Sequence, residues 1–130
     1  MKAAIDTASR AAAANARSRT LMKATFRAAA LLGLPQAELA PILGVSRATV
    51  SRMASGEHLP APEQKTWELA ALFVRLFRSL DALVGSNEAQ ARAWLNSDNA
   101  GLGGVPRAQL KRAEGLVRAV QYLDAARGRI

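Results

Sequence analysis

Two short helical patterns that meet at Gly44 constrain the fold of this chain more than any other feature. Leu39 and Leu43 stand four residues apart, so they share one face of the first pattern. Glycine can adopt the left-handed conformation that ends a helix, and Ser46 follows as an N-cap for a second helix. Val50 lies on the apolar face of that second helix. The segment therefore predicts a helix-turn-helix, whose second helix can enter the major groove of DNA.

An ordinary helical hairpin with a solvated polar face is the alternative, because leucine, alanine and glycine are common at such spacings. The helix-turn-helix is favoured because eight positions agree with it at once: Gln36, Leu39, Ala40, Leu43, Gly44, Val45, Val50 and Met53. Pro41 departs from the pattern, since a proline beyond the first turn removes a backbone hydrogen bond and crowds the residue four earlier. If the first helix opens at Pro35, we expect a kink or a shortened helix at Pro41.

The outward face of the predicted second helix carries side chains that can read DNA. Arginine bonds the guanine edge or holds a phosphate, while serine and threonine bond bases or phosphates. Gln36, near the start of the first helix, is expected beside the DNA backbone, because helix N-termini favour phosphate. The predicted DNA-binding residues are Gln36, Ser46, Arg47, Thr49, Ser51 and Arg52.

The run from Gly44 to Arg52, Gly-Val-Ser-Arg-Ala-Thr-Val-Ser-Arg, resembles the Xre-like (lambda-repressor-like) helix-turn-helix family of bacteria. The resemblance covers roughly residues 20–60. It implies a DNA-binding domain and leaves open which process that domain controls.

Composition favours an all-α fold, because half of the 130 residues are hydrophobic, aromatic residues are few and alanine is abundant. The net charge of +8 agrees with a polyanionic partner. Cysteine is absent, which fits a reducing cytoplasm. No apolar run approaches the twenty residues of a membrane span, so we expect no membrane partner.

The order of patterns predicts four segments. Residues 1–17 form an Ala/Arg-rich arm that is partly disordered or loosely helical, and that either attracts phosphate or serves as a solubilising tail. Residues 18–62 form the helix-turn-helix domain, which includes a helix from about Thr20 to Leu32. Residues 63–84, opened by Pro62, form a long linking helix, and residues 85–130 form a small helical C-terminal domain.

The predicted linking helix, residues 63–84, is apolar on nearly every side, which indicates burial on several faces. A monomer of this length has little protein to cover such a helix. We therefore expect this helix to contribute to a homodimer. A dimer also fits DNA reading, because two recognition helices must lie about 34 Å apart to reach successive major grooves.

The C-terminal segment changes in character after Gly85. Asn87 is a plausible N-cap for a short helix, Pro106 opens another, and Gly115 interrupts or offsets it before the apolar positions continue to Gly128. The glycine-rich loop of residues 96–105 lacks the preceding strand and the Gly-Lys-Ser/Thr of a nucleotide-binding loop. Nothing in the sequence indicates a cofactor.

This half resembles the toxin-binding domain of Xre/MbcA/ParS-type antitoxins, through Trp94-Leu95, Leu102, Gly104, Pro106, Leu110, Gly115, Val120, Leu123 and Gly128. It departs from the family at Arg107, Gln109 and Arg112. The resemblance implies a bacterial type II antitoxin that covers the active site of a toxin encoded beside it, commonly a RES-domain enzyme that consumes NAD⁺, and that represses its own operon. The expected toxin-binding residues are Trp94, Leu102, Gly104, Pro106, Leu110, Gly115, Arg118, Arg127 and Arg129.

The arginines near the end of the chain suggest a cationic tail that enters a pocket built for an anionic dinucleotide; a solvated helix face is the alternative. Catalysis is not expected, because His58 is the one histidine and has no obvious partner, and no nucleophile set or metal-ligand cluster can be drawn. Two other functions stay open: a stand-alone repressor, and a toxin-binding scaffold that no longer binds DNA.

Overall fold

The structure, a computed structural model, describes residues 2–128 and contains helices but no strand within that range. The helices, in chain order, are α1 (Lys2–Leu32), α2 (Gln36–Leu43), α3 (Arg47–Ser55), α4 (Lys65–Leu83), α5 (Glu88–Asn96), α6 (Pro106–Gln109) and α7 (Ala113–Gly128). An isolated antiparallel bridge joins Asn99 and Gly104 in the loop before α6. The predicted all-α fold is confirmed.

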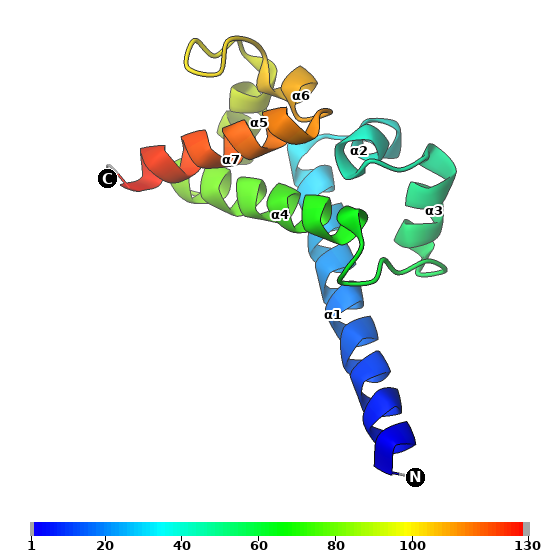
Figure 1. Ribbon diagram of the computed structural model, residues 1–130. Helices are drawn as coiled ribbons and strands as arrows, with labels where there is room; N and C mark the ends of the chain where they lie inside the picture. Colours follow the sequence, from blue (N-terminus) through cyan, green and yellow to red (C-terminus); the bar gives the residue numbers. More distant parts are fainter. Residues whose placement is uncertain (1, 129–130) are drawn as a thin grey trace.

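Helix α4 lies across the middle of the molecule, with α1 crossing it on one side and α7 running beside it (Figure 1). Its residues Phe73, Leu76 and Leu80 are fully buried, and α2 and α5 also contact it. The helix begins at Lys65 after Gln64 as N-cap, three residues later than Pro62 suggested. One chain therefore covers most of the apolar side chains of α4, contrary to our expectation that a second copy is needed for this.

Helix α1 is continuous from Lys2, whereas the sequence suggested a helix that starts near Thr20. Alanine has the highest intrinsic helix propensity, which explains why the alanine-rich stretch joins the helix. Burial begins at Ser18, whose hydroxyl donates a 2.6 Å hydrogen bond to the carbonyl oxygen of Pro60. The first half of α1 therefore projects from the body of the molecule (Figure 1).

Helix α2 begins at Gln36, with Pro35 in the N-cap position and its carbonyl oxygen accepting from the backbone N–H of Leu39 at 3.0 Å. The helix continues through Pro41 and ends two residues later at Leu43. It spans eight residues, so the helix that contains the proline is short.

Arg107 of α6 connects the two halves of the chain. Its guanidinium donates to both carboxylate oxygens of Glu38 on α2, to the carbonyl oxygen of Gly33 and to the side chain of Asn96. Lys111 adds an ion pair with Glu38 at 3.6 Å. The hydrogen bond from Arg107, and then the positive charges of Arg107 and Lys111, hold the pKa of Glu38 below its ordinary value against the opposing effect of burial.

This ion pair predicts a pH-dependent effect of the substitution Arg107→Met. Because the pKa of Glu38 is lower in the folded state, its stabilising effect is present above the unfolded pKa and lost as the pH falls through the folded pKa. We expect Arg107→Met to lower the free energy of unfolding by about 1 kcal/mol at neutral pH, since both side chains remain partly exposed.

The measurement is urea denaturation of both proteins between neutral pH and about pH 3. The difference between wild type and variant should shrink as Glu38 becomes protonated. Arg112→Met is the matched control, because Arg112 is exposed and makes no ion pair with the described residues. A difference that stays constant over the whole pH range would contradict the assignment.

Candidate functional site

Helices α2 and α3 pack against each other through the residues that the sequence placed inside. Leu39, Leu43 and Val50 are fully buried, and Met53 is 2% exposed. Gly44 ends α2 with a φ angle of +70°, and the backbone N–H of Val45 donates to the carbonyl oxygen of Ala40 at 3.0 Å. The predicted helix-turn-helix geometry is confirmed.

Ser46 caps α3, because its hydroxyl oxygen accepts from the backbone N–H of Thr49 at 3.1 Å. The two hydroxyl oxygens are 2.9 Å apart, and the guanidinium of Arg52 donates to the Thr49 hydroxyl at 3.2 Å. Three of the predicted DNA-binding side chains thus form one exposed chain of hydrogen bonds. In this arrangement Ser46 supports the start of the recognition helix and Thr49 orients Arg52.

The predicted DNA-binding side chains face solvent. Arg47 and Arg52 are both exposed, and neither makes an ion pair with another residue of the described range. Thr49 is half-buried, while the rest of the predicted set, Gln36, Ser46 and Ser51, is exposed. Exposed guanidinium groups on a solvent-facing helix can reach base edges or phosphates.

Two further cations, which the sequence analysis did not select, lie close to α3. Arg19 and Lys23 of α1 line a hollow of about 480 Å³ together with Met53, Ala54 and Gly56 at the end of α3. Their spacing of four residues places both on one face of α1, which is the signal that could have identified them. They extend the positive charge beside the recognition helix.

Several predicted toxin-binding residues lie inside the C-terminal domain. Leu102 and Leu110 are 4% and 1% exposed, and Pro106 is buried at the first position of α6. Gly104 pairs with Asn99, and Gly115 lies against the backbone of Gln109. Side chains buried to this extent do not form a surface. Leu102, Pro106 and Leu110 shape the domain beneath the surface, and the expectation that the whole predicted set contacts a toxin stays a prediction.

An aromatic pair of exposed Tyr122 and half-buried Trp94 marks the outer face of this domain. The ring centroids of Trp94 on α5 and Tyr122 on α7 are 6.4 Å apart, and Tyr122 is 38% exposed. Exposed Arg118 lies one turn before Tyr122 on α7. Sequence reasoning missed Tyr122. Two signals could have identified this residue: it stands four residues after Arg118, and it is the single tyrosine of the chain.

The terminal arginines are not gathered on one face. Arg118 and Arg127 are nine residues apart, which is half a turn out of phase on a helix, so they lie on opposite sides of α7. Arg127 is exposed, and its guanidinium donates to the hydroxyl of Ser79 on α4 at 3.1 Å. The same hydroxyl donates to Asp124, and this bond, together with Arg75, holds the pKa of Asp124 below its ordinary value. Arg129 lies outside the described residues.

Comparison with known families agrees with this division of the molecule. Residues 11–75, half of the chain, match the family model described as "Antitoxin Xre-like helix-turn-helix domain". The chain belongs to the Xre-like antitoxin family. Residues 79–129 match the model described as "Antitoxin Xre/MbcA/ParS C-terminal toxin-binding domain". A search of curated proteins found no match to the chain.

The two matched regions of this antitoxin meet inside α4, between residues 75 and 79. The same helix therefore supplies core residues to the DNA-binding half and to the toxin-binding half. The matches support an antitoxin with a DNA-binding domain and a toxin-binding domain.

Two further properties concern the described part of this antitoxin. None of its helices combines the length and the apolarity that crossing a bilayer requires. Nowhere in residues 2–128 do three or more histidine or acidic side chains gather so that they could hold a metal ion.

Proposed function

We propose that this antitoxin neutralises the toxin encoded beside it and represses its own operon by binding operator DNA. The observation that carries the proposal is the presence of an exposed recognition helix and a toxin-binding domain on one chain, joined through the core of α4. The protein acts in the cytoplasm and has no catalytic role of its own. We also propose that the chain divides after residues 17, 62 and 84 into the N-terminal arm, the helix-turn-helix domain, the linking helix and the toxin-binding domain.

The proposed toxin is a RES-type enzyme that consumes NAD⁺, and the antitoxin covers its active site. Exposed Tyr122 and Arg118, with half-buried Trp94 beside them, form the proposed contact. Arg129 belongs to the proposed cationic tail, whereas Arg127 is held against Ser79 on α4. Guanidinium groups are suited to a pocket that accepts the phosphates of a dinucleotide.

The proposed operator complex contains two copies of the antitoxin. Helix-turn-helix proteins place their two recognition helices about 34 Å apart to read successive major grooves, which one copy of α3 does not provide. The support for a homodimer is therefore the geometry of DNA. The apolar residues of α4 give no support for a homodimer, because one chain covers most of them.

Co-expression with the adjacent gene tests the proposal. The product of that gene alone should arrest growth, and the antitoxin should restore growth and co-purify with it. A variant with the outer face altered, Trp94→Ala with Arg118→Glu, should lose both effects, while Lys2→Glu on the projecting arm should keep them. Growth arrest that the wild-type antitoxin does not relieve would overturn the proposal.

DNA binding gives a second, independent test through Arg47. We expect Arg47→Ala to weaken binding to the cognate promoter by about 1–3 kcal/mol, because the bidentate guanidinium contact is lost. Arg47→Lys should not restore the loss, since lysine retains the charge but cannot form the planar pair. Fluorescence anisotropy with a labelled promoter fragment at fixed salt measures both variants. Arg112→Ala, which removes one exposed positive charge from the C-terminal half, is the control. Unchanged affinity of Arg47→Ala would exclude base reading by this residue.

A further inference from the structure

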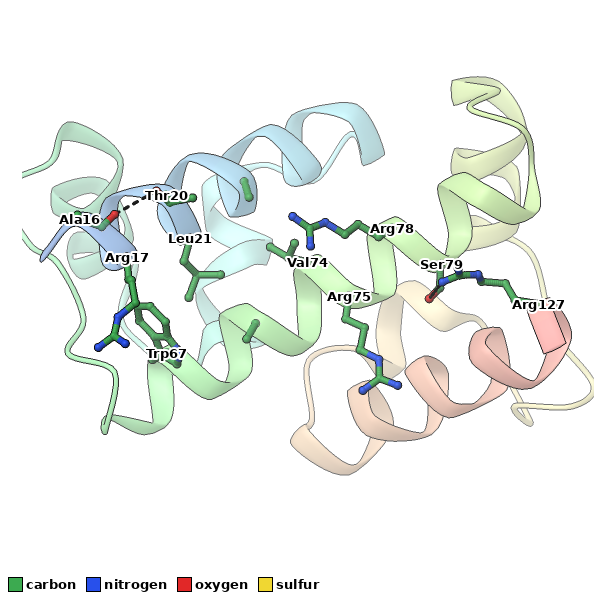
Figure 2. A pocket seen from close by; sticks show the side chains of 12 residues that line it. Ala16, Arg17, Thr20, Leu21, Trp67, Val74, Arg75, Arg78, Ser79 and Arg127 are labelled. Carbon is green, nitrogen blue, oxygen red and sulfur yellow. Dashed lines mark hydrogen bonds between the residues drawn. The ribbon is translucent and has the colours of Figure 1, made fainter. Parts of the chain in front are cut away.

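A groove of about 630 Å³ lies between the middle of α1 and the length of α4, outside the aromatic face described above. Figure 2 shows Leu21 of α1 and Trp67 and Val74 of α4 pointing into it. The small side chains Ala16, Ala24 and Ala71 leave the space between the two helices open. The groove is therefore apolar along its floor.

The rim of the groove is positively charged. Arg17, Arg75, Arg78 and Arg127 line it, and no acidic side chain does. Arg75 pairs with Asp124, and Arg127 bonds the hydroxyl of Ser79, whereas Arg17 and Arg78 make no ion pair with the described residues. An occupant that matches this surface must present an apolar stripe flanked by carboxylates.

The dimensions fit an α-helix. Trp67 and Ser79 are twelve residues apart on α4, which corresponds to about 18 Å or about three helical turns. Amphipathic helices bind such grooves through apolar side chains at positions i, i+3 or i+4, and i+7. Tryptophan and arginine, which both occur here, are the residues that most often dominate the energetics of protein interfaces.

The groove continues from the toxin-binding domain onto the DNA-binding half. Ser79 and Arg127 belong to the matched toxin-binding region, residues 79–129, and Arg78 directly precedes it. The other lining residues lie in the matched helix-turn-helix region, residues 11–75. We propose that the toxin inserts an acidic amphipathic helix into this groove, and this proposal rests on the proposed function as antitoxin. A second copy of this chain is a poorer occupant, because each copy carries a net charge of +8.

A pair of designed peptides tests the chemistry of the groove without the toxin. In the full chain with Trp94→Phe, Trp67 is the one remaining tryptophan and reports occupancy by fluorescence. An 18-residue helical peptide of leucine and glutamate, about 27 Å long, should give a saturable signal. A peptide of leucine and lysine with the same spacing should give none. No response to the acidic peptide, or equal responses to both, would overturn the proposal.

The toxin itself tests the identity of the occupant. The double variant Arg17→Glu/Arg78→Glu should bind the product of the adjacent gene at least about tenfold more weakly than wild type, since like charges then oppose the partner. The control Lys2→Glu/Arg10→Glu changes the net charge equally at exposed positions of α1 outside the groove and should bind as wild type does. Isothermal titration calorimetry measures the affinities.

The outcomes separate the two proposals. If wild-type antitoxin does not bind the toxin, the proposed function fails. If wild type binds and the Arg17→Glu/Arg78→Glu variant binds equally well, the function stands and the groove proposal is overturned. If the double variant instead changes the sedimentation coefficient of the antitoxin alone, the groove joins two copies of this chain and the toxin is not its occupant.

Discussion

Replacing Gly115 with alanine is expected to lower the free energy of unfolding by about 3 kcal/mol, the upper end of the usual cost of overpacking. A β-carbon at this position would lie 2.1 Å from the carbonyl oxygen of Gln109 and 2.9 Å from its carbonyl carbon. Both atoms belong to the backbone, so no side-chain rotation relieves the clash. The turn between α6 and α7 must open instead, and the outer face of the domain moves with it.

Thermal unfolding followed by circular dichroism measures this effect, which corresponds to a decrease in Tm of several degrees or more for a chain of this length. Gly128→Ala is the control, because it is also a helical glycine of α7 and a β-carbon there meets nothing within 4 Å. We expect its Tm to equal or slightly exceed that of wild type. Equal stability of Gly115→Ala and Gly128→Ala would show that the turn is not closed as described.

Replacing Phe73 with alanine is expected to cost about 3–5 kcal/mol, because its side chain is fully buried and its removal leaves a cavity. Phe73 belongs to α4, against which α1 and α7 both pack (Figure 1). The substitution should therefore destabilise the DNA-binding half and the toxin-binding half together.

Two single-tryptophan proteins distinguish the halves, since Trp67 lies near α1 and Trp94 lies beside Tyr122. Urea denaturation of Trp94→Phe and Trp67→Phe, each with and without Phe73→Ala, should give coincident transitions that shift by the same amount. Phe77→Ala, at a half-buried position of the same helix, should have a smaller effect. Two separate transitions would show that α4 does not unite the halves.

The helix-turn-helix was predictable because its signals are local. The four-residue spacing of Leu39 and Leu43, the glycine at position 44 and the serine cap all act within a few residues of one another. The caps at Asn87 and the start of α6 at Pro106 were predicted for the same reason.

The contacts between the halves were not predictable, because they depend on tertiary structure. The pair between Glu38 and Arg107 joins residues 69 positions apart in the sequence. The coverage of α4 by α7 likewise joins distant segments, so the pattern of α4 correctly indicated burial but wrongly suggested that a second copy is needed for it. The sequence predicted a regular helix only from about Thr20 and left residues 1–17 as partly disordered or loosely helical, since alanine-rich segments are compatible with both; the structure has one helix from Lys2.

The sequence predicted which side chains α3 exposes more accurately than it predicted the surface of the C-terminal domain. Arg47 and Arg52 are exposed on the recognition helix as predicted, because helical phase alone decides which side they occupy. In the C-terminal domain, family resemblance selected Leu102 and Leu110, which form the core, since a motif includes the residues that keep a domain folded as well as those that bind. Tyr122 became apparent only through its position beside Trp94.

We infer that one chain carries two separate binding surfaces, one for DNA and one for a toxin. Native mass spectrometry of the antitoxin mixed with the adjacent gene product and a promoter fragment tests this claim most directly. The predicted result is a species that contains all three components, from which Arg47→Ala removes the DNA and Trp94→Ala with Arg118→Glu removes the toxin. Spectra in which wild-type antitoxin binds neither component, or in which one variant removes both, would contradict the account.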